Sequence, residues 1–403
     1  MNRKPMKSAG LITLLLLFLI FAIPNLINSR ERLAFSDQHR YEVAKKQLDN
    51  IRNDTAEVVL SSFYNRGPVV KYLFGTHYRS TWSQKISLPV FHMNEVKGGL
   101  KLDEIGGGQQ TFSIKLKSDA GKKYTLRSVH KDQSRALPRI LQFSCFRPLF
   151  RDQASALNPF AAVITNHFER ALDILHTKPK MYYVPYDKST PQDLNEKLAG
   201  RVMILEEEPG GTWKNSEVFD YASDIMSTED LFKEQLQKGV VIDSLNYLKC
   251  RLLDIMISDW DRHGGQWEWA IMQSDNGTVA KPIAMDRDMA FFKFDDGLLN
   301  QFALFLNNKF QSFKPDYEDV SGLMKNSSSI DRFILGNISE DTFVEMAQHV
   351  QSVITDSLID KAFREYPQGI YQELAPEHTT TLKIRRSKLP EIARKFHKLI
   401  NNS

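Results

Sequence analysis

The spacing of apolar positions changes several times along this 403-residue chain. Residues 31–65 are first charged and then apolar at helical intervals, which predicts one or two amphipathic helices. From residue 99 the period becomes two, because LKLDEI, TFSIKLKS and KYTLRSVH alternate apolar and polar positions as half-buried antiparallel strands do. The runs MYYVP and RVMILEE extend this prediction to a five-stranded sheet, and helical patterns over 134–143 and 159–175 lie between the strands.

The second half of the chain is predicted to be mainly helical, with one hairpin. Residues 241–257 form a strongly apolar helical run. The alternating runs WEWAIMQ and VAKPIAM flank the turn SDNG and predict a β-hairpin. Residues 298–401 return to helical spacing and end in a basic stretch that is typical of a solvated helix face. Strands followed by helices favour an α+β fold, as one large domain or two lobes.

The first residues predict a segment that meets a membrane. Arg3, Lys4 and Lys7 precede the apolar run LITLLLLFLIFAIP, which ends at Pro24. A short apolar run behind a basic start is typical of a signal peptide or an uncleaved N-terminal anchor, and both alternatives stay open because no cleavage site is clear. We therefore expect residues 1–29 to direct export across a membrane, with 11–27 as the anchor if it is retained.

Composition and charge exclude several classes of protein. The 42% hydrophobic and 25% charged residues are ordinary for a globular protein, which argues against extensive disorder and against many membrane spans. A net charge of +4 over this length gives no indication of nucleic-acid binding. Cys145 and Cys250 lie too far apart for a metal-ligand spacing, and two reduced thiols are expected rather than a disulfide.

Two pairs of aspartates are the main candidates for chemistry. Asp259 and Asp261 follow the apolar helix 241–257, while Asp286 and Asp288 follow the second strand of the hairpin. The hairpin between them is expected to bring the two pairs face to face. Phosphoryl transfer needs such an arrangement, with one carboxylate to orient the attacking hydroxyl and another, with an amide partner, to hold a metal ion. Gln266, five residues after Asp261, is placed to supply that amide.

These motifs carry a resemblance to a known family. The order DRH, Gln five residues after the Asp, a hairpin and then DRDMAF resembles the catalytic segment of atypical protein-kinase-like enzymes, which include Golgi casein kinases, HipA-type kinases, spore-coat-protein kinases and type II phosphatidylinositol 4-kinases. The whole chain also resembles a group of bacterial envelope-associated proteins with HYR..W, GGGQQT and LRSV.KD elements. The kinase resemblance covers about 99–310. It implies a bilobal fold, with an antiparallel-sheet lobe over 99–207, a larger helical lobe over 208–403, and a helical extension and connector over 30–98 before them.

The resemblance also implies roles for single residues. Asp261 takes the position of the catalytic Asp, with Arg262 and His263 beside it to orient it, and Asp286 takes that of the metal ligand. Gln266 stands where Asn or Glu is usual, and Asp288 where several families have Gly. The resemblance therefore implies ATP with Mg²⁺ or Mn²⁺ as cofactors. It implies a catalytic set of Asp261, Arg262 and His263, and a set of metal ligands made of Asp286, Gln266 and Asp288.

The expected nucleotide contacts come from the sheet lobe. Gly106, Gly107 and Gly108, followed by Gln109, are placed as a loop over the phosphates, although a wide turn would use the same residues. Arg127 stands where the family has Lys, with Lys131 as the alternative, and Arg does not simply replace Lys. Glu169 is expected either to pair with this base or to be an exposed helix charge. Glu206 and Glu207 stand at the position of the kinase hinge or at a solvated strand end.

The sequence thus predicts an exported or membrane-anchored phosphotransferase that uses ATP and acts on a hydroxyl group of a protein, sugar or lipid. The Arg127 substitution leaves a second hypothesis, a catalytically silent pseudokinase that only binds its ligands. A third is a nucleotidyl transferase on the same fold. The expected partners are the nucleotide, the acceptor and, through residues 11–27, a membrane, but no nucleic acid.

Overall fold

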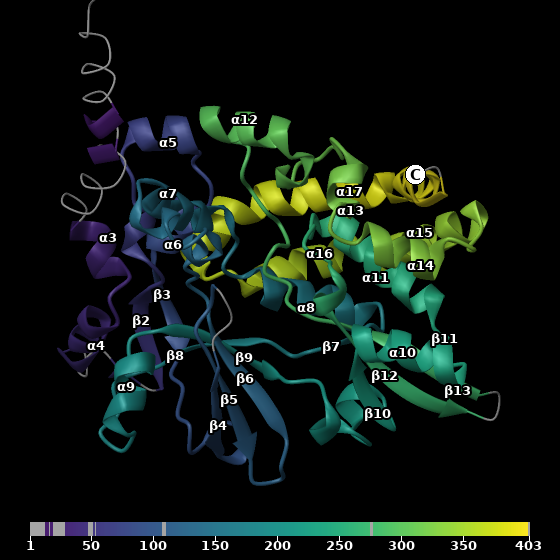
Figure 1. Cartoon of the computed structure of the whole chain (residues 1–403), viewed down its shortest axis with the longest axis horizontal. Coiled ribbons are helices and arrows are strands. Elements are labelled where there is room, and N and C mark those ends of the chain that lie inside the picture. The colour runs from purple at the N-terminus through teal and green to yellow at the C-terminus, as the bar shows by residue number, and fades with distance from the viewer. Residues whose placement is uncertain are drawn as a thin grey trace, which may run out of the picture.

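The computed structural model describes residues 13–15, 17–18, 29–46, 51–52, 54–106, 110–274 and 277–401 (Figure 1). Gly107, Gly108 and Gln109 lie outside the described residues, as does most of the apolar run 11–24. Across the described part of the chain, no helix is both long and apolar enough to cross a membrane.

A five-stranded antiparallel sheet forms one lobe, as predicted. Its order is β4 (Leu100–Gly106), β5 (Ser113–Ser118), β6 (Lys123–Ser128), β9 (Val202–Glu207) and β8 (Lys180–Tyr183). Leu126 pairs with Leu205, and both are buried on one face, while the neighbouring pair of Arg127 and Ile204 points to the other face. The helix expected over 159–175 is α8 (Ala161–Ala171), between β6 and β8. The alternation of the sequence therefore decides which face carries Arg127.

A second sheet contains the predicted hairpin. Strands β12 (Trp267–Ser274) and β13 (Gly277–Ala284) pair antiparallel, and β10 (Asp224–Ser227), β11 (Val241–Ile242) and β7 (Leu175–His176) complete the sheet. Apolar residues of the hairpin, such as Ala270 and Ile283, belong to the same buried cluster as Leu126 and Leu205 of the first sheet. This shared core fixes the hairpin against the sheet lobe.

The remainder of the chain is mostly helical, which confirms the prediction for 298–401. The apolar helix is α11 (Ser244–Ile257), which packs against α17 (Gln368–Asn401). Arg385 of α17 donates hydrogen bonds of 2.7 Å to the carbonyl oxygens of Ile255 and Met256, at the end of α11 where carbonyl groups lack helical partners. The other helices of this lobe are α10 (Thr228–Lys238), α12 (Leu298–Leu306), α13 (Val320–Met324), α14 (Ser328–Leu335), α15 (Glu340–Val353) and α16 (Asp356–Ala362).

Two expectations for the first half were wrong in part. Residues 31–65 form α3 (Ser29–Ala34) and α4 (Asp37–Lys46), but Thr55–Val59 is strand β2, which pairs with β1 (Ile51–Arg52) and β3 (Lys85–Pro89). The sequence TAEVV is rich in β-branched residues, and pairing with a strand 30 residues later overrides its helical spacing. Instead of one helix over 134–143 there are short 3-10 turns on either side of Pro138, because proline disfavours a helix before it.

Three short helices and one longer one complete the extension and the sheet lobe. They are α5 (Pro68–Phe74), α6 (Arg79–Ser83), α9 (Gln192–Leu198) and α7 (Phe146–Gln153).

Candidate functional site

The end of α11 positions the first aspartate pair. The helix ends at Ile257, and Ser258 follows it with a φ of 59°, which turns the chain sharply. Arg262 is fully buried and donates hydrogen bonds to the carbonyl oxygens of Met285 (2.5 Å) and Gln266 (3.2 Å). Its guanidinium lies 4.4 Å from the ring centre of Trp267. Arg262 therefore ties the DRH loop to the end of β13, where the second aspartate pair begins.

Arg287, between the two aspartates of the second pair, is the centre of a buried ion network. It donates to Glu169 at 2.7 Å and to Asp259 at 3.2 Å, and it also bonds Asp254 on α11. Asp254 is further paired with Arg251 (2.7 Å) and Arg262 (3.2 Å). The expectation that Glu169 pairs with the phosphate-binding base is thus corrected. Glu169 instead binds Arg287 and helps to fix the backbone between Asp286 and Asp288.

Asp259 belongs to this network and not to the open site. It is 1% exposed. Burial raises the pKa of Asp259 to about 6, against the opposing effect of Arg262 and Arg287. Its role is therefore to support the loop from below, together with the three tryptophans of this segment, which are all buried: Trp260, Trp267 and Trp269.

Arg127 brings the sheet lobe to the second aspartate pair. Asp286 has a φ of 50°, and Arg127 pairs with its carboxylate and, at 3.0 Å, with that of Glu206. Burial would raise the pKa of Asp286, but the charges of Arg127 and Lys131 outweigh it and hold this pKa well below its usual range. Burial raises the pKa of Glu206, which Arg127 only partly offsets. Arg127 thus bridges two carboxylates, one on each side of the interlobe contact.

Lys131 lies beside the same aspartates, so the structure brings both candidate bases to the site. It forms an ion pair with Asp288. Burial lowers the pKa of Lys131, while the negative charges of Asp286 and Asp261 act against this lowering. The ammonium group of Lys131 therefore interacts electrostatically with both Asp261 and Asp286, although these lie 25 residues apart along the chain.

Asp261 is partly exposed and is held by a residue that the sequence analysis missed. The side-chain amide of Asn326, between α13 and α14, donates to Asp261 Oδ1 at 2.6 Å. Lys309 lies 4.6 Å from the ring centre of Trp260, and its pKa is lowered by burial, which the charge of Asp261 opposes. No spacing or motif connects 261 with 309 or 326, so only the packing of the helical lobe reveals these neighbours.

His263 and Gln266 make contacts within their own loop. The His263 ring is exposed, and its Nδ1 accepts from the backbone N–H of Gly265 at 3.1 Å. Its Nε2 lies 3.5 Å from the side-chain amide nitrogen of Gln266. Among the described contacts, Arg262 holds the loop and Asn326 holds Asp261. His263 stabilises the turn at Gly265.

The hinge candidates are buried, which excludes solvated strand ends. Glu206 accepts from the hydroxyl of Thr177 at 3.1 Å, and Glu207, 2% exposed, accepts from the backbone N–H of Lys178 at 2.7 Å. Gly106 ends β4 opposite Ser113. The contribution of these backbones to a nucleotide site stays a prediction.

The HYR..W element supports the chain that follows the second aspartate pair. Tyr78 donates from its hydroxyl to the carbonyl oxygen of Phe291 at 2.5 Å, and His77 Nε2 lies 3.1 Å from that of Phe294. Arg79 pairs with Asp152 at 2.6 Å, and the Trp82 indole donates to the carbonyl oxygen of Leu157. These buried contacts give the element a structural role.

The residues present fit a divalent metal ion only in company with a phosphate group. Within the described ranges, no group of three or more His, Cys, Asp or Glu side chains converges as a complete metal site. Asp286 and Asp288 supply two carboxylates from one turn. Mg²⁺ is commonly held by one or two carboxylates, with water and substrate phosphates as the other ligands. Each of these carboxylates already has a basic partner, so a metal would need Arg127 and Lys131 to move to the phosphates.

Comparison with known proteins identifies no family. No family model matches the chain, and no curated protein matches it. Among solved structures, the Helicobacter pylori proinflammatory kinase CtkA aligns with a TM-score of 0.35 and 9% identity, over 74% of this chain and 95% of that one. The Golgi casein kinase aligns with a TM-score of 0.32 and 11% identity, over 90% of this chain and 91% of that one. TM-scores this low carry no weight for the fold or the activity, so any functional assignment depends on the site itself.

Proposed function

We propose that this chain is a kinase-like phosphotransferase that moves the γ-phosphoryl group of ATP to a hydroxyl group of an acceptor. The observation that carries the proposal is the position of Lys131, beside Asp288 and within the electrostatic influence of both Asp286 and Asp261. Arg127 reaches the same place from β6. Two basic groups and three carboxylates from two lobes are the parts that phosphoryl transfer requires.

In this proposal, Asp261 orients the acceptor hydroxyl and accepts its proton. Asn326 holds Oδ1 of Asp261, which leaves Oδ2 for the acceptor. The side chain is partly exposed, in contrast to the buried Asp259, so an acceptor has access to it. The buried network beneath keeps the loop in place while the acceptor binds.

The basic residues bind the phosphates. Arg127 offers a planar fork suited to two phosphate oxygens, and Lys131 offers a single charge. The proposed contacts also include the backbone of the loop 106–108, for the phosphates, and the backbone of Glu206 and Glu207, for the adenine edge. Asp286, with Asp288 and Gln266, would hold Mg²⁺ or Mn²⁺, which neutralises charge on the transferring group.

The ion pairs also favour a second candidate, a binding module without turnover. Asp286 pairs with Arg127 and Asp288 with Lys131, so their charges are compensated by the protein itself. A pseudokinase of this kind would keep the fold and a ligand site but would transfer no phosphate.

The test compares the full chain with two variants, Asp261→Asn and Asp286→Asn, incubated with γ-labelled ATP and Mg²⁺ or Mn²⁺. The matched control is Asp193→Asn, an exposed aspartate on α9. We expect label on an acceptor or on the chain in the wild type and control, and its loss in both site variants. A metal-dependent rise in melting temperature with ATP should persist in Asp261→Asn and disappear in Asp286→Asn.

The other outcomes separate the candidates. An ATP-dependent rise in melting temperature without label transfer supports the binding module. Label that persists in Asp286→Asn, or the absence of both label and ATP binding, refutes the proposed phosphotransferase.

A further inference from the structure

Helix α12 buries a polar residue and exposes large apolar ones. Asn300 is the buried residue of this helix; its amide donates to the carbonyl oxygen of Phe294 at 2.8 Å and lies 2.9 Å from His77 Nε2. Phe302 is 63% exposed and Phe305 is 85% exposed. A helix on the surface of a water-soluble protein normally turns its apolar side inward. The apolar side of α12 is therefore suited to a surrounding other than water.

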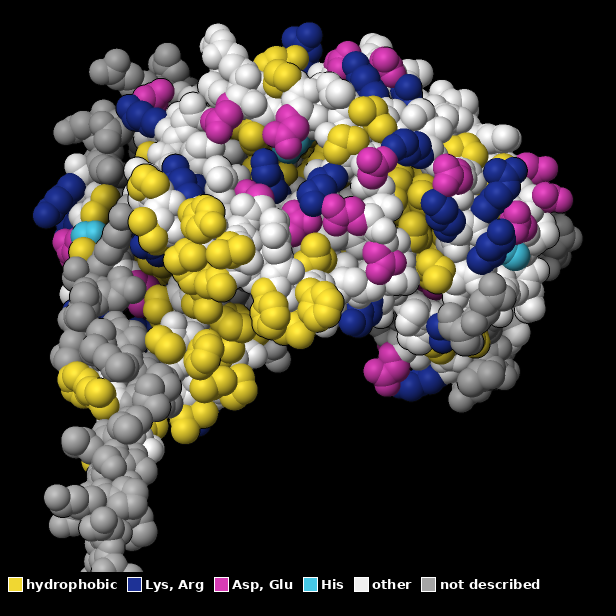
Figure 2. Space-filling view, turned by 90° about the horizontal axis from the view of Figure 1, so that it is seen from above, with side chains coloured by type: hydrophobic (Ala, Val, Ile, Leu, Met, Phe, Trp, Pro, Cys, Tyr) yellow, Lys and Arg dark blue, Asp and Glu magenta, His cyan; other side chains and the backbone are white. Residues whose placement is uncertain are grey.

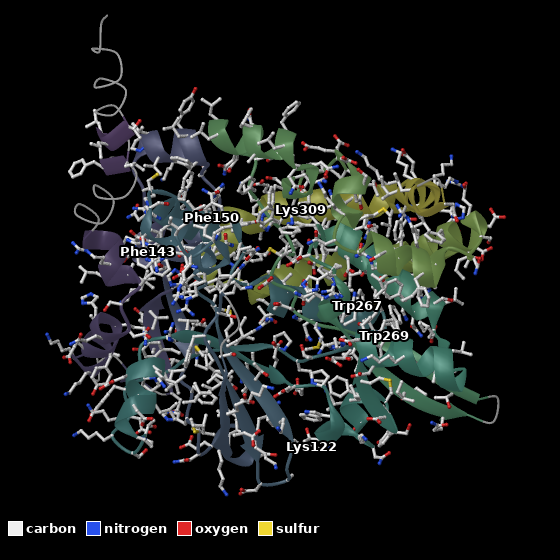
Figure 3. All side chains as sticks on the ribbon, in the orientation of Figure 1. Lys122, Phe143, Phe150, Trp267, Trp269 and Lys309 are labelled. Carbon is white, nitrogen blue, oxygen red and sulfur yellow. The ribbon has the colours of Figure 1, made fainter. Side chains whose placement is uncertain are left out.

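Neighbouring elements extend this apolar side into a continuous surface, which Figure 2 shows as a broad hydrophobic area. Val69 on α5 is 71% exposed, and every residue of α5 is at least partly exposed. Phe143 and Phe150, labelled in Figure 3, come from the chain at α7. We define the apolar face by its large exposed hydrophobic residues: Val69, Tyr72, Ile140, Phe143, Phe146, Phe150, Leu298, Leu299, Phe302, Phe305 and Leu306.

The apolar face is held firmly by polar contacts beneath it. Asp296 accepts from the backbone N–H of His77 at 2.7 Å. The start of α12 and the end of α5 pack so closely that a Cβ at Gly297 would lie 2.2 Å from the backbone nitrogen of Gly75. The two helices therefore present their exposed side chains as one preformed surface, and exposure of this extent marks an interaction site.

The N-terminal apolar run indicates what covers this face. Glu31 of α3 pairs with Arg147 (2.9 Å) and Arg151 (2.8 Å) of α7, which also carries Phe146 and Phe150. The chain thus enters the fold beside the apolar face. Four residues, 25–28, lie between Pro24 and Ser29, so the run and α3 are close along the chain.

The described part of the run is not covered by the fold. Leu14 is 65% exposed, and Leu15, Leu17 and Phe18 are exposed as well. In Figure 1 these residues lie at the level of α5, on the side of the molecule where α12 also lies. The described residues of the run therefore lie on the same side of the molecule as α5 and α12 (Figure 1).

We propose that the apolar face lies on a lipid bilayer, beside the point where the N-terminal run enters the same bilayer. Helix α12, with nine residues, is about 14 Å long, less than half of a hydrocarbon core of about 30 Å, so it lies on the membrane and does not span it. Phe and Leu side chains, which make up most of the face, are typical of a helix that lies in the membrane interface with its apolar side in the acyl boundary. This proposal is independent of the phosphotransfer reaction.

The test measures the lipid contact of single sites in the full chain. A fluorophore is attached at Phe305→Cys or Ile140→Cys in a Cys145→Ser background, with one chain per phosphatidylcholine nanodisc. The control is Ala120→Cys, an exposed residue in the turn after β5; Lys122 of the same turn is labelled at the opposite end of the molecule in Figure 3. We expect lipids with brominated acyl chains to quench the fluorophore at the two face positions and not at Ala120→Cys.

A pair of surface variants gives an independent reading. Phe302→Gln with Leu306→Gln should reduce quenching at Ile140→Cys, whereas Tyr221→Gln, an exposed aromatic outside the face, should not. If the chain stays bound to the nanodisc but the fluorophores at the face positions are not quenched, the N-terminal run alone attaches the chain and the apolar face does not contact lipid. This result would overturn the proposal. The fluorophore at the face positions could instead be shielded from water only when several chains share a disc, with no quenching by brominated lipid. That result would identify a second copy of the chain as the occupant and would also overturn the proposal.

Discussion

Replacing Arg287 by methionine tests whether the buried network supports the site. Methionine keeps much of the volume but removes a guanidinium that binds Glu169, Asp254 and Asp259. Asp254 retains two other arginines, so most of the cost comes from the carboxylates that lose their close partner. Removing one member of a buried ion pair costs about 3–5 kcal/mol. We expect the free energy of unfolding to fall by about 4 kcal/mol, a large share of the 5–15 kcal/mol of a typical domain.

The assay is urea unfolding at pH 8 and at pH 5, with Arg139→Met, an exposed arginine, as the control. Burial already raises the pKa of Asp259 to about 6, and without Arg287 this pKa rises further above its value in the unfolded chain. The folded variant then binds more protons, so its stability rises as the pH falls, and the deficit shrinks at pH 5. The double variant Arg287→Met with Glu169→Leu should recover part of the loss, because it leaves one fewer buried charge. A loss below about 1 kcal/mol, or one that is the same at both pH values, would refute the reasoning.

Three further predictions follow from single side chains. Burial, with Asp230 and Glu208 nearby, raises the pKa of Glu268 to about 7. In urea titrations, Glu268→Gln should therefore raise the free energy of unfolding by about 1 kcal/mol at pH 8, where the carboxylate is charged, and leave it unchanged at pH 5. Arg127→Lys keeps the charge but loses the fork, so KM for ATP should rise about tenfold in steady-state kinetics with a smaller change in kcat; an unchanged KM would show that Arg127 does not contact the nucleotide. Arg385→Met leaves carbonyl groups at the end of α11 unpaired and should lower the free energy of unfolding by about 2 kcal/mol, whereas an unaltered urea midpoint would contradict this role.

The sequence predicted the parts of the fold that depend on local pattern. The period of two placed β4, β5 and β6, and the runs MYYVP and RVMILEE placed β8 and β9. The hairpin was recognised from its alternation and turn, and with it the proximity of the two aspartate pairs. β2 was missed because Thr55–Val59 also fits a helical spacing, and only its pairing with β3 decides between the two.

The partners of the site residues were harder to predict, because they depend on which helices pack together. Asn326 reaches Asp261 from 65 residues away. Glu169 was visible as a charge on a predicted helix, but its distance of 118 residues from Arg287 carries no periodic signal. The structure places Arg287 in the core at 4% exposure, a position that its two acidic neighbours in the sequence do not indicate.

The contacts of Arg385 with the end of α11 have a consequence for the order of biosynthesis. Arg385 follows Met256 by 129 residues, so the ribosome has completed both aspartate pairs long before the last partner of α11 exists. A nascent chain that stops before α17 contains Asp261 and Asp286 but lacks Arg385, which binds the last carbonyl oxygens of α11. Truncation before Arg385 should therefore be as damaging to the site as a truncation within the site itself.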